Sequence, residues 1–475
     1  MSMDVAVVVA YLVAMIAFGF WGKRRARTES DFLVAGRRLG PLLYAGTLSA
    51  LVLGGASTIG GVGLGYEYGL SGMWLVVAIG TGVLLLSLLF AGRIQRLRVY
   101  TVSQMLQLRY GPGSSVLSGV VMFGYTLMLT VTSTIAYATI FAALLDLPRV
   151  PSILVGGLVV VIYSALGGMW SITLTDFVQF FIQTVGIFLI LLPVVLVQAG
   201  GFAAVPPEAL SPTTIGGETI LTYFVIYTFG LLIGQDIWQR VFTARSPGVA
   251  RWAGAAAGVY CLLYGVAGAL VGMGASVLVP GLEEPGDAFT AVVGATMTPV
   301  LAGLVLAAAL AAVMSTASGS LIATATVFGQ DIAQRLRGRA DGSEAEHVRG
   351  HRLLVIAFGV VAIVIACLLQ DVVGALTIAY DILVGGLLVP ILGGLVWRRA
   401  TIVGAVAAMA VGTVGTLVTM AVVGDIDANE PIYVGLAAGL AVFVVGSLVS
   451  RPTAPDVLAE WDRRSSGAAA EAPVA

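Results

Sequence analysis

A cluster of hydroxyl side chains interrupts an apolar stretch of the chain at residues 308–326, with the sequence AALAAVMSTASGSLIATAT. Six side chains in this stretch carry a hydroxyl: Ser315, Thr316, Ser318, Ser320, Thr324 and Thr326. In a membrane helix, hydroxyls bond back to carbonyls of their own helix or join two helices. They can also replace the water around a hard cation, because sodium takes oxygen ligands. The residue types alone leave both interpretations open.

Glycine is concentrated in a second apolar stretch, residues 49–69, with the sequence SALVLGGASTIGGVGLGYEYG. Each glycine costs a helix about 1 kcal/mol relative to alanine, so this many favour a break. Close packing of two helices through small residues would also explain them. The other explanation is an unwound segment whose free carbonyls coordinate an ion or a solute, as in secondary transporters.

A similar interruption occurs in residues 220–242, ILTYFVIYTFGLLIGQDIWQRVF, where Gly230 and Gly234 precede Gln235 and Asp236. This stretch is the fifth apolar span after the glycine-rich one. Interrupted helices at matching positions of two five-helix halves indicate an inverted repeat with its site between the halves.

Asp176 is an acidic residue inside the apolar stretch at 164–183, SALGGMWSITLTDFVQFFIQ. A carboxylate near a helix start is stabilised by the helix dipole. A carboxylate inside a membrane also indicates a functional site, and here its natural partner is a cation. Both roles stay open.

The elements that position these residues are predicted to be membrane helices. The chain has 475 residues, of which 59% are hydrophobic and 10% are charged. Soluble domains carry about 25% charged residues. The mean hydropathy is +1.01, and apolar stretches of about 20 residues recur along the chain. We therefore predict an all-α integral membrane protein whose first apolar stretch is a retained helix.

We predict thirteen spans, at residues 3–22, 41–66, 71–91, 115–145, 150–167, 173–198, 219–242, 250–279, 289–333, 351–369, 372–397, 401–424 and 430–450. With the N-terminus outside, every Lys and Arg except Arg149 falls on the cytoplasmic side, as the positive-inside rule requires. Arg240 is counted there, and no basic residue is expected inside a span. The C-terminus is then inside, residues 1–450 form one membrane domain, and the tail 451–475 is predicted to be disordered.

Three motifs resemble the sodium:solute symporter family: GGMWSITLTDFVQ at 167–179, GQDIWQRVFTARS at 234–246 and LAAVMSTASGSL at 310–321. The resemblance covers essentially the whole chain. It implies a LeuT-type fold of two inverted five-helix repeats, at residues 41–198 and 219–397. One extra N-terminal helix with a basic loop (1–40) and two extra C-terminal helices (401–450) would flank the repeats.

The resemblance also implies a sodium site between the second and the ninth span. Its ligands would be three backbone carbonyls and two hydroxyls: Ala56, Ile59, Ala312, Ser315 and Thr316. These neutral oxygens agree with the interpretation of the hydroxyl cluster as cation ligands. Some members bind a second sodium ion, and Asp176 and Ser318 match residues of that site. Gly319 stands where such members offer a further hydroxyl.

Solute contacts are implied by the same resemblance. Gln235 matches a polar position of sugar-type members, and Gly60 and Gly63 leave room for a solute. Further candidates are Thr58, Tyr125, Tyr227 and Tyr380. Proline-type members carry an acid where Thr58 stands. We therefore expect a small neutral or weakly polar solute, or a monocarboxylate held by backbone amides.

Two further acids, Glu67 and Asp381, are expected to be solvated near span ends.

The predicted function is sodium-coupled secondary active symport, with a small organic solute imported across the plasma membrane by alternating access. We expect no enzymatic activity, no nucleic acid and no obligate protein partner; Na⁺ is the one cofactor and the lipid bilayer surrounds the protein. A proton-coupled transporter of the same fold is an alternative, which Ser315 and Thr316 argue against. A membrane sensor or channel would need an output domain or a continuous polar pore.

Overall fold

The computed structural model describes residues 3–145, 147–201, 205–337, 343–369, 372–425 and 428–466. Every element in this part of the chain is helical, apart from one isolated bridge between Leu39 and Ala244. The first half contains α1 (Met3–Lys23), α2 (Glu29–Val34), α3 (Pro41–Val52), α4 (Gly61–Tyr68), α5 (Trp74–Leu85), α6 (Gly92–Arg96), α7 (Val102–Tyr110), α8 (Ser115–Leu145), α9 (Arg149–Gln183), α10 (Leu192–Gln198), α11 (Gly217–Tyr223), α12 (Phe229–Ile233) and α13 (Gln235–Thr243). The second half contains α14 (Pro247–Leu278), α15 (Ala288–Thr296), α16 (Pro299–Val327), α17 (Gln334–Arg337), α18 (Glu344–Leu368), α19 (Val372–Val396), α20 (Ile402–Val423), α21 (Glu430–Val449) and α22 (Pro455–Ser466).

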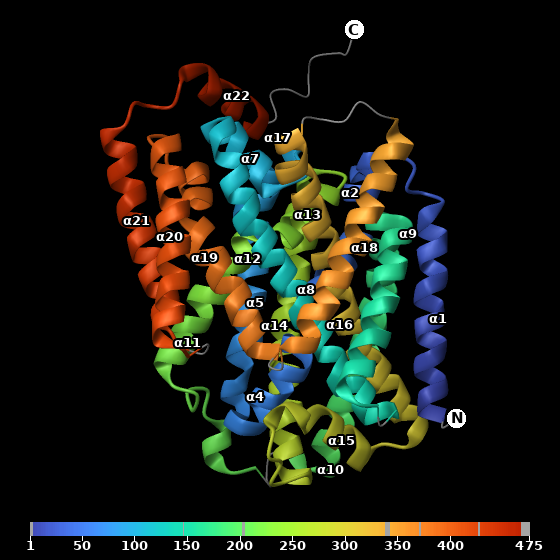
Figure 1. The fold of residues 1–475 in the computed structure, drawn as a ribbon. Helices are drawn as coiled ribbons and strands as arrows, with labels where there is room; N and C mark the ends of the chain where they lie inside the picture. The colour runs from blue at the N-terminus through green and yellow to red at the C-terminus, as the bar shows by residue number, and fades with distance from the viewer. Residues whose placement is uncertain are drawn as a thin grey trace.

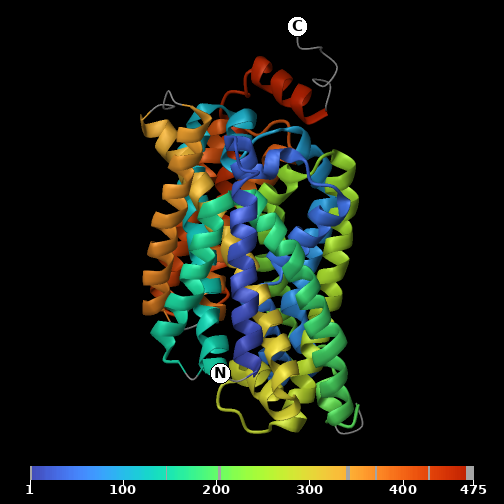
Figure 2. The same ribbon diagram turned by 90° about the vertical axis from the view of Figure 1, so that its right-hand side faces the viewer.

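The long helices run side by side between two ends of the molecule (Figures 1 and 2). Among the described residues, 10 helices are long and apolar enough to cross a membrane, or 11 if the bent pair α11–α13 is one span. Helix α1 begins at the end that carries α10 and α15, and α22 lies at the opposite end. The chain is therefore an all-helical, multi-pass membrane protein.

Two of the long apolar segments are longer than one crossing. Arg149–Gln198 has 50 residues and Ala56–Arg96 has 41, whereas about 20 residues span a bilayer. Gly168 divides the first segment, because its φ of 53° lies outside the helical region and separates two helices within α9. A Cβ at this position would lie 2.5 Å from the Phe32 carbonyl oxygen, so glycine is required there. Gly69, with a φ of 61°, divides the second segment.

Both predicted helix interruptions are present. Helix α3 ends at Val52, Leu53 has non-helical dihedrals (φ −93°, ψ 67°), and a π-helical turn resumes at Ala56–Gly60. Helices α12 and α13 meet at Gly234, which is extended (φ −62°, ψ 133°), and the bend is 42°. Glycine explains both breaks, since it weakens a helix interior.

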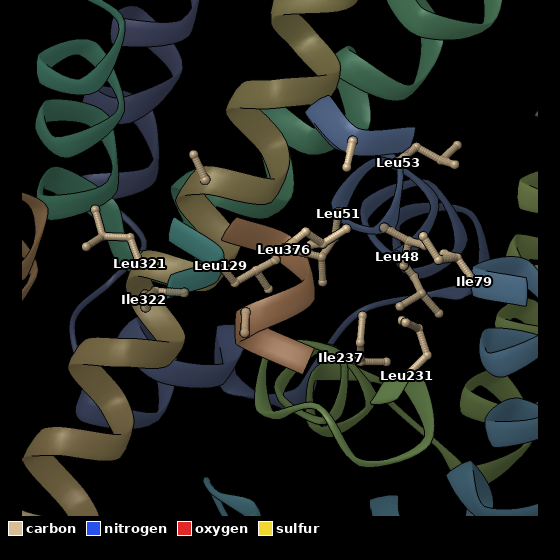
Figure 3. Packing of buried hydrophobic residues seen from close by; sticks show 14 of the residues in the cluster. Leu48, Leu51, Leu53, Ile79, Leu129, Leu231, Ile237, Leu321, Ile322 and Leu376 are labelled. Carbon is tan, nitrogen blue, oxygen red and sulfur yellow. The ribbon is translucent and has the colours of Figure 1, made fainter. Parts of the chain in front are cut away.

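Helix α16 lies at the centre of the bundle, in contact with α1, α3, α8, α9 and α18. Every residue from Val305 to Val327 is buried. The hydroxyl cluster therefore faces protein rather than lipid, which is where a membrane protein tolerates polar groups. Figure 3 shows the apolar side chains around the two breaks, among them Leu48, Leu51, Ile79, Leu129, Leu231, Ile237 and Leu376.

The C-terminal tail differs from the expectation of disorder over residues 451–475. Residues Pro455–Ser466 form helix α22, which contacts α6 and α7. Trp461 is buried there, and the Arg93 guanidinium lies 5.3 Å from its ring centroid. This helix is amphipathic, so it gains stability by covering Trp461, which composition alone does not reveal. Residues 467–475 lie outside the described part of the chain.

Candidate functional site

The break in α3 lies directly against the hydroxyl pair of α16. Gly54 makes this approach possible, since a Cβ at residue 54 would lie 2.5 Å from Thr316 Oγ1. A Cβ on Gly55 would meet Ala136 of α8 at the same distance. The glycine-rich sequence therefore allows both the break and close packing, the two explanations that composition left open.

Ser315 and Thr316 donate hydrogen bonds to the last turn of α3. Ser315 Oγ donates to the carbonyls of Ala50 (2.6 Å) and Ala312 (2.8 Å), and Thr316 Oγ1 donates to the carbonyl of Leu51 (2.5 Å). The last carbonyls of a helix have no partner within it, so these side chains satisfy them. Two hydroxyls and three carbonyls thus converge where two helices meet, and neutral oxygens of this kind are suitable ligands for Na⁺.

The three carbonyls predicted as sodium ligands differ in how close they lie to the hydroxyl pair and to the cavity at the break. Ala312 accepts hydrogen bonds from both hydroxyls, the one from Thr316 at 3.5 Å. Ala56 lines the cavity described below, together with Thr316. Ile59 is buried one turn into the π-helical segment and does not line that cavity. Ala50 and Leu51, which the sequence did not indicate, supply the α3 carbonyls that contact the hydroxyls.

The other hydroxyls of α16 bond mainly to their own helix. Ser318 donates to Ser315, Ser320 to Thr316, Thr324 to Ser320 and Thr326 to Ile322, each through a backbone carbonyl at 2.7–3.0 Å. Two of them also join neighbouring elements, since Thr130 bonds to Ser320 and Gln239 bonds to Thr326. Only Ser315 and Thr316 face the helix break.

Asp176 forms an ion pair with Arg240. Arg240 Nη2 lies 2.9 Å from Asp176 Oδ2, and Thr47 Oγ1 donates to the same oxygen at 2.5 Å. Both charged side chains are 0% exposed. Arg240 was expected on the cytoplasmic side, with no basic residue in a span; its side chain is instead buried in the protein interior, where the carboxylate of Asp176 compensates its charge. Sequence separation concealed the pair, since the partners are 64 residues apart.

A small central cavity of about 30 Å³ lies at the break in α3. Apolar side chains form most of its wall, together with backbone and polar groups: Leu51, Val52, Gly54, Gly55, Ala56, Ser57, Ile79, Leu129, Thr132, Ser133, Leu231, Asp236, Ile237, Thr316, Leu376 and Tyr380. This volume is enough for about one water molecule. Asp236 is the one charged side chain among these residues, and Tyr125 donates a hydrogen bond to its Oδ1 at 2.8 Å.

Most of the predicted solute contacts have other partners. Gln235 holds the loop before α7, because its Oε1 accepts from the Val102 amide (2.8 Å) and its Nε2 donates to the Tyr100 carbonyl (3.0 Å). Thr58 bonds to the Tyr264 hydroxyl at 2.9 Å. A Cβ on Gly63 would lie 2.8 Å from the carbonyl of Pro285.

Three of the remaining candidates, Gly60, Tyr125 and Tyr227, do not line the cavity. Gly60 closes the π-helical turn. The rings of Tyr125 and Tyr227 each contact Tyr380, with centroids 5.4 Å apart. Of the seven predicted positions, only Tyr380 lines the cavity. The sequence missed Asp236, although it is the next residue after Gln235 in the motif.

Asp381 is not solvated at the end of a span, so that expectation is also wrong. It lies within α19 with a residue exposure of 0%, and neither carboxylate oxygen has a hydrogen-bond partner among the described residues. Glu67, by contrast, is exposed as expected.

A multi-pass helical protein in which two broken helices meet at a central cavity has the architecture of a secondary transporter. The family model described as "Sodium:solute symporter family" matches residues 32–412. The chain belongs to the sodium:solute symporter family. It is therefore a sodium-coupled symporter that carries Na⁺ and a small organic solute, and a transporter rather than an enzyme.

Relatives and solved structures agree with this assignment. A sodium/proline symporter of Staphylococcus aureus is 26% identical over 445 residues, covering 87% of this chain and 85% of the relative. The structure of a Na⁺-coupled sialic acid symporter has a TM-score of 0.82 at 18% identity, covering 95% of this chain and 99% of the other. Mhp1, a nucleobase-cation-symport-1 family transporter, has a TM-score of 0.56 at 17% identity, covering 93% and 99%. The TM-scores establish a shared LeuT-type fold, and at such low identities the likeness is one of fold alone.

Proposed function

We propose that the protein imports a small organic solute across the plasma membrane by alternating access, driven by one Na⁺ bound where α16 meets the broken α3. The observation that carries this proposal is the pair of hydroxyls, Ser315 and Thr316, against the carbonyls at the end of α3. The site adjoins the central cavity through Thr316. A cation and a solute at neighbouring positions stabilise the same arrangement of helices, which couples their binding.

In this proposal Ser315, Thr316 and the Ala312 carbonyl hold the ion from α16. Carbonyls of the α3 break complete the site, those of Ala56 and Ile59 by the family resemblance. Asp176 and Ser318 were predicted to bind a second ion. The guanidinium of Arg240 already compensates Asp176, and Ser318 bonds to its own helix. We therefore propose transport with one Na⁺.

We further propose thirteen spans with the N-terminus outside the cell. Division of α9 at Gly168 and of the segment Ala56–Arg96 at Gly69 supports the larger number of spans. The start of α1 and the whole of α22 lie at opposite ends of the bundle, which agrees with an odd number of spans between them.

The test of the function is thermal unfolding of the purified protein in NaCl and in KCl at equal ionic strength. A ligand that binds only the native state raises the melting temperature with its concentration. We expect Na⁺ to raise it and K⁺ to leave it unchanged. Equal melting temperatures in the two salts, combined with stabilisation as the pH is lowered, would favour the proton-coupled alternative.

A further inference from the structure

A small recess of about 40 Å³ lies against the C-terminal helix α22, at the end of the bundle opposite to the start of α1. It is separate from the central cavity and has room for about one water molecule or an ion of similar size. Three basic side chains line the recess: Arg93 of α6, Arg109 of α7 and Arg398, which follows α19. Helix α22 contributes Trp461 and Asp462 to its wall. Positive groups from three elements therefore converge on one small space.

Arg109 is the most deeply buried of the three basic residues, with an exposure of 1%. Its Nε donates to the carbonyl of Gly394 at 3.0 Å, and its Nη2 donates to the carbonyls of Trp397 (2.9 Å) and Arg398 (3.2 Å). These bonds cap the end of α19 with neutral acceptors. Nη1 has no hydrogen-bond partner among the described residues. A buried charged donor without an acceptor is costly, so this guanidinium favours a further, negatively charged partner.

The residues that line the recess carry more positive than negative charge. Asp462 is the one carboxylate among them, and its Oδ2 lies 2.7 Å from Arg398 Nη2. In the described parts of the chain, no ion pair joins Arg93 or Arg109 to a carboxylate. Arg93 Nη1 donates instead to the carbonyl of Leu395 at 2.7 Å. Two guanidiniums thus lie at one recess without a counter-ion, an arrangement that a bound anion would stabilise.

We propose that this recess binds a monoatomic anion of the size of chloride between the guanidiniums of Arg93 and Arg109. Hydrogen bonds between charged donors and an anion are stronger than neutral ones. The volume selects a small ion, since a tetrahedral oxyanion needs more room than one water molecule. Because α22 forms one wall of the site and also contacts α6 and α7, the anion would hold this helix against the bundle. The inference does not depend on the proposed sodium site.

The first experiment varies the anion while the Na⁺ concentration and the ionic strength stay constant. The purified full-length protein is titrated from sodium gluconate into sodium chloride, sodium bromide or sodium methanesulfonate, and the melting temperature gives an apparent affinity. We expect chloride and bromide to raise the melting temperature with saturation, and the larger methanesulfonate to leave it unchanged. The same response to chloride and methanesulfonate would be a general salt effect and would overturn the proposal.

A substitution in the recess tests whether the anion binds there. Arg93→Gln removes one guanidinium and leaves the carbonyl bonds of Arg109 in place, so it should weaken chloride binding by about tenfold or more. Arg352→Gln is the matched control, because Arg352 is also half-buried and donates to a carbonyl, that of Leu166 at 3.0 Å, outside the recess. It should respond to chloride like the wild type. Unchanged chloride affinity in Arg93→Gln contradicts the inference.

Digestion with trypsin reports on α22 itself in the unsubstituted protein. Arg463 and Arg464 lie in the last turn of this helix, and cleavage there requires that the helix open locally. We expect slower cleavage in sodium chloride than in sodium methanesulfonate, with a reporter peptide to correct for effects of the salts on trypsin. The difference should disappear in Arg93→Gln. Equal cleavage rates of the wild type in the two salts would show that no anion holds α22 in place.

Discussion

Asp176 and Arg240 form an ion pair that is wholly buried between α9 and α13, with 2.9 Å between Oδ2 and Nη2. The pair brings a fixed positive charge to the position where a second sodium ion was predicted. Gly319, which replaces a hydroxyl of that site, lies against the same group, because a Cβ there would be 3.1 Å from Arg240 Nη2. The same Cβ would lie 2.2 Å from Leu51 Cδ1, so glycine at 319 allows α3 and the guanidinium to pack closely against α16.

Breaking this pair should destabilise the protein while leaving the number of sodium ions at one. Asp176→Asn leaves Arg240 buried without a counter-ion, which typically costs about 3–5 kcal/mol. The double variant Asp176→Asn, Arg240→Gln removes both charges and should recover part of that loss, a coupling measured by a double-mutant cycle. Thermal unfolding and sodium titration provide the two readouts. A wild-type Hill coefficient for sodium near two that falls to one in Asp176→Asn would restore the second sodium site.

Loss of the hydroxyls of Ser315 and Thr316 should affect sodium far more than it affects folding. An interhelical hydroxyl bond in a membrane protein contributes about 0.6 kcal/mol, so each alanine variant should remain folded in KCl. Removal of two ligand oxygens should greatly raise the apparent dissociation constant for Na⁺ in melting experiments. Because coupling is reciprocal, solute affinity in the double variant should lose its dependence on sodium.

Thr324→Ala provides the control for this prediction. Thr324 lies on the same helix and donates to the Ser320 carbonyl at 2.8 Å, without facing the break. It should bind Na⁺ like the wild type. Equal sodium affinity in the wild type and in the double variant would remove Ser315 and Thr316 from the site.

Gly54→Ala should weaken sodium binding by separating α3 from α16. The added Cβ would lie 2.5 Å from Thr316 Oγ1 and 2.9 Å from its Cβ, so either the hydroxyl or the break must shift. We expect a lower melting temperature and reduced stabilisation by Na⁺. Gly286→Ala is the matched control, since a Cβ there meets nothing within 4 Å. Identical sodium responses in the two variants would mean that the close approach of α3 and α16 is unimportant.

Glu29, the first residue of α2, should make the stability of the protein depend on pH. His351 bonds to Glu29 Oε1 (3.0 Å) and lowers the pKa of this carboxyl. Gln330 donates to the same oxygen at 2.6 Å, and His347 lies 3.8 Å from the other. The fourth neighbouring group is Glu344, whose carboxylate accepts from the Glu29 amide at 2.7 Å.

The direction in which stability changes with pH follows from the lowered pKa of Glu29. A carboxylate with a depressed pKa in the folded state stabilises the protein above its ordinary pKa, and this stabilisation is lost as the pH falls through the depressed value. Melting temperature against pH should therefore decline in acid for the wild type and less steeply for Glu29→Gln, which starts lower at neutral pH. Glu208→Gln, at an exposed position, should leave the profile unchanged. Parallel profiles for the wild type and Glu29→Gln would contradict the assignment.

Labelling of single cysteines should place the two ends of the bundle on opposite sides of the membrane. Glu284→Cys, just before α15, should react with an impermeant reagent added outside intact cells, and Ala345→Cys, in the first turn of α18, should react only after permeabilisation. Both positions are exposed. The reverse pattern would place the N-terminus in the cytoplasm.

The sequence by itself determined the class of the protein and the positions of both helix breaks. Both can be predicted without coordinates because they depend on local properties: apolar stretches, the cost of glycine in a helix and the motif around Ser315. Thus residues 49–69 and Gly234 were correctly predicted to interrupt helices. The hydroxyls of α16 were likewise recognisable as a cluster in the sequence, although only Ser315 and Thr316 of that cluster face the break.

The tertiary structure alone decided which polar residues meet at these breaks. Arg240 was assigned to the cytoplasmic side by the positive-inside rule, and only folding brings Asp176 to it from another helix to form a buried ion pair. Gln235 and Asp236 are neighbours in the chain, yet one holds the loop before α7 and the other lines the cavity. The bend at Gly234 resets the direction in which α13 presents its side chains, so periodicity from α12 could not distinguish them.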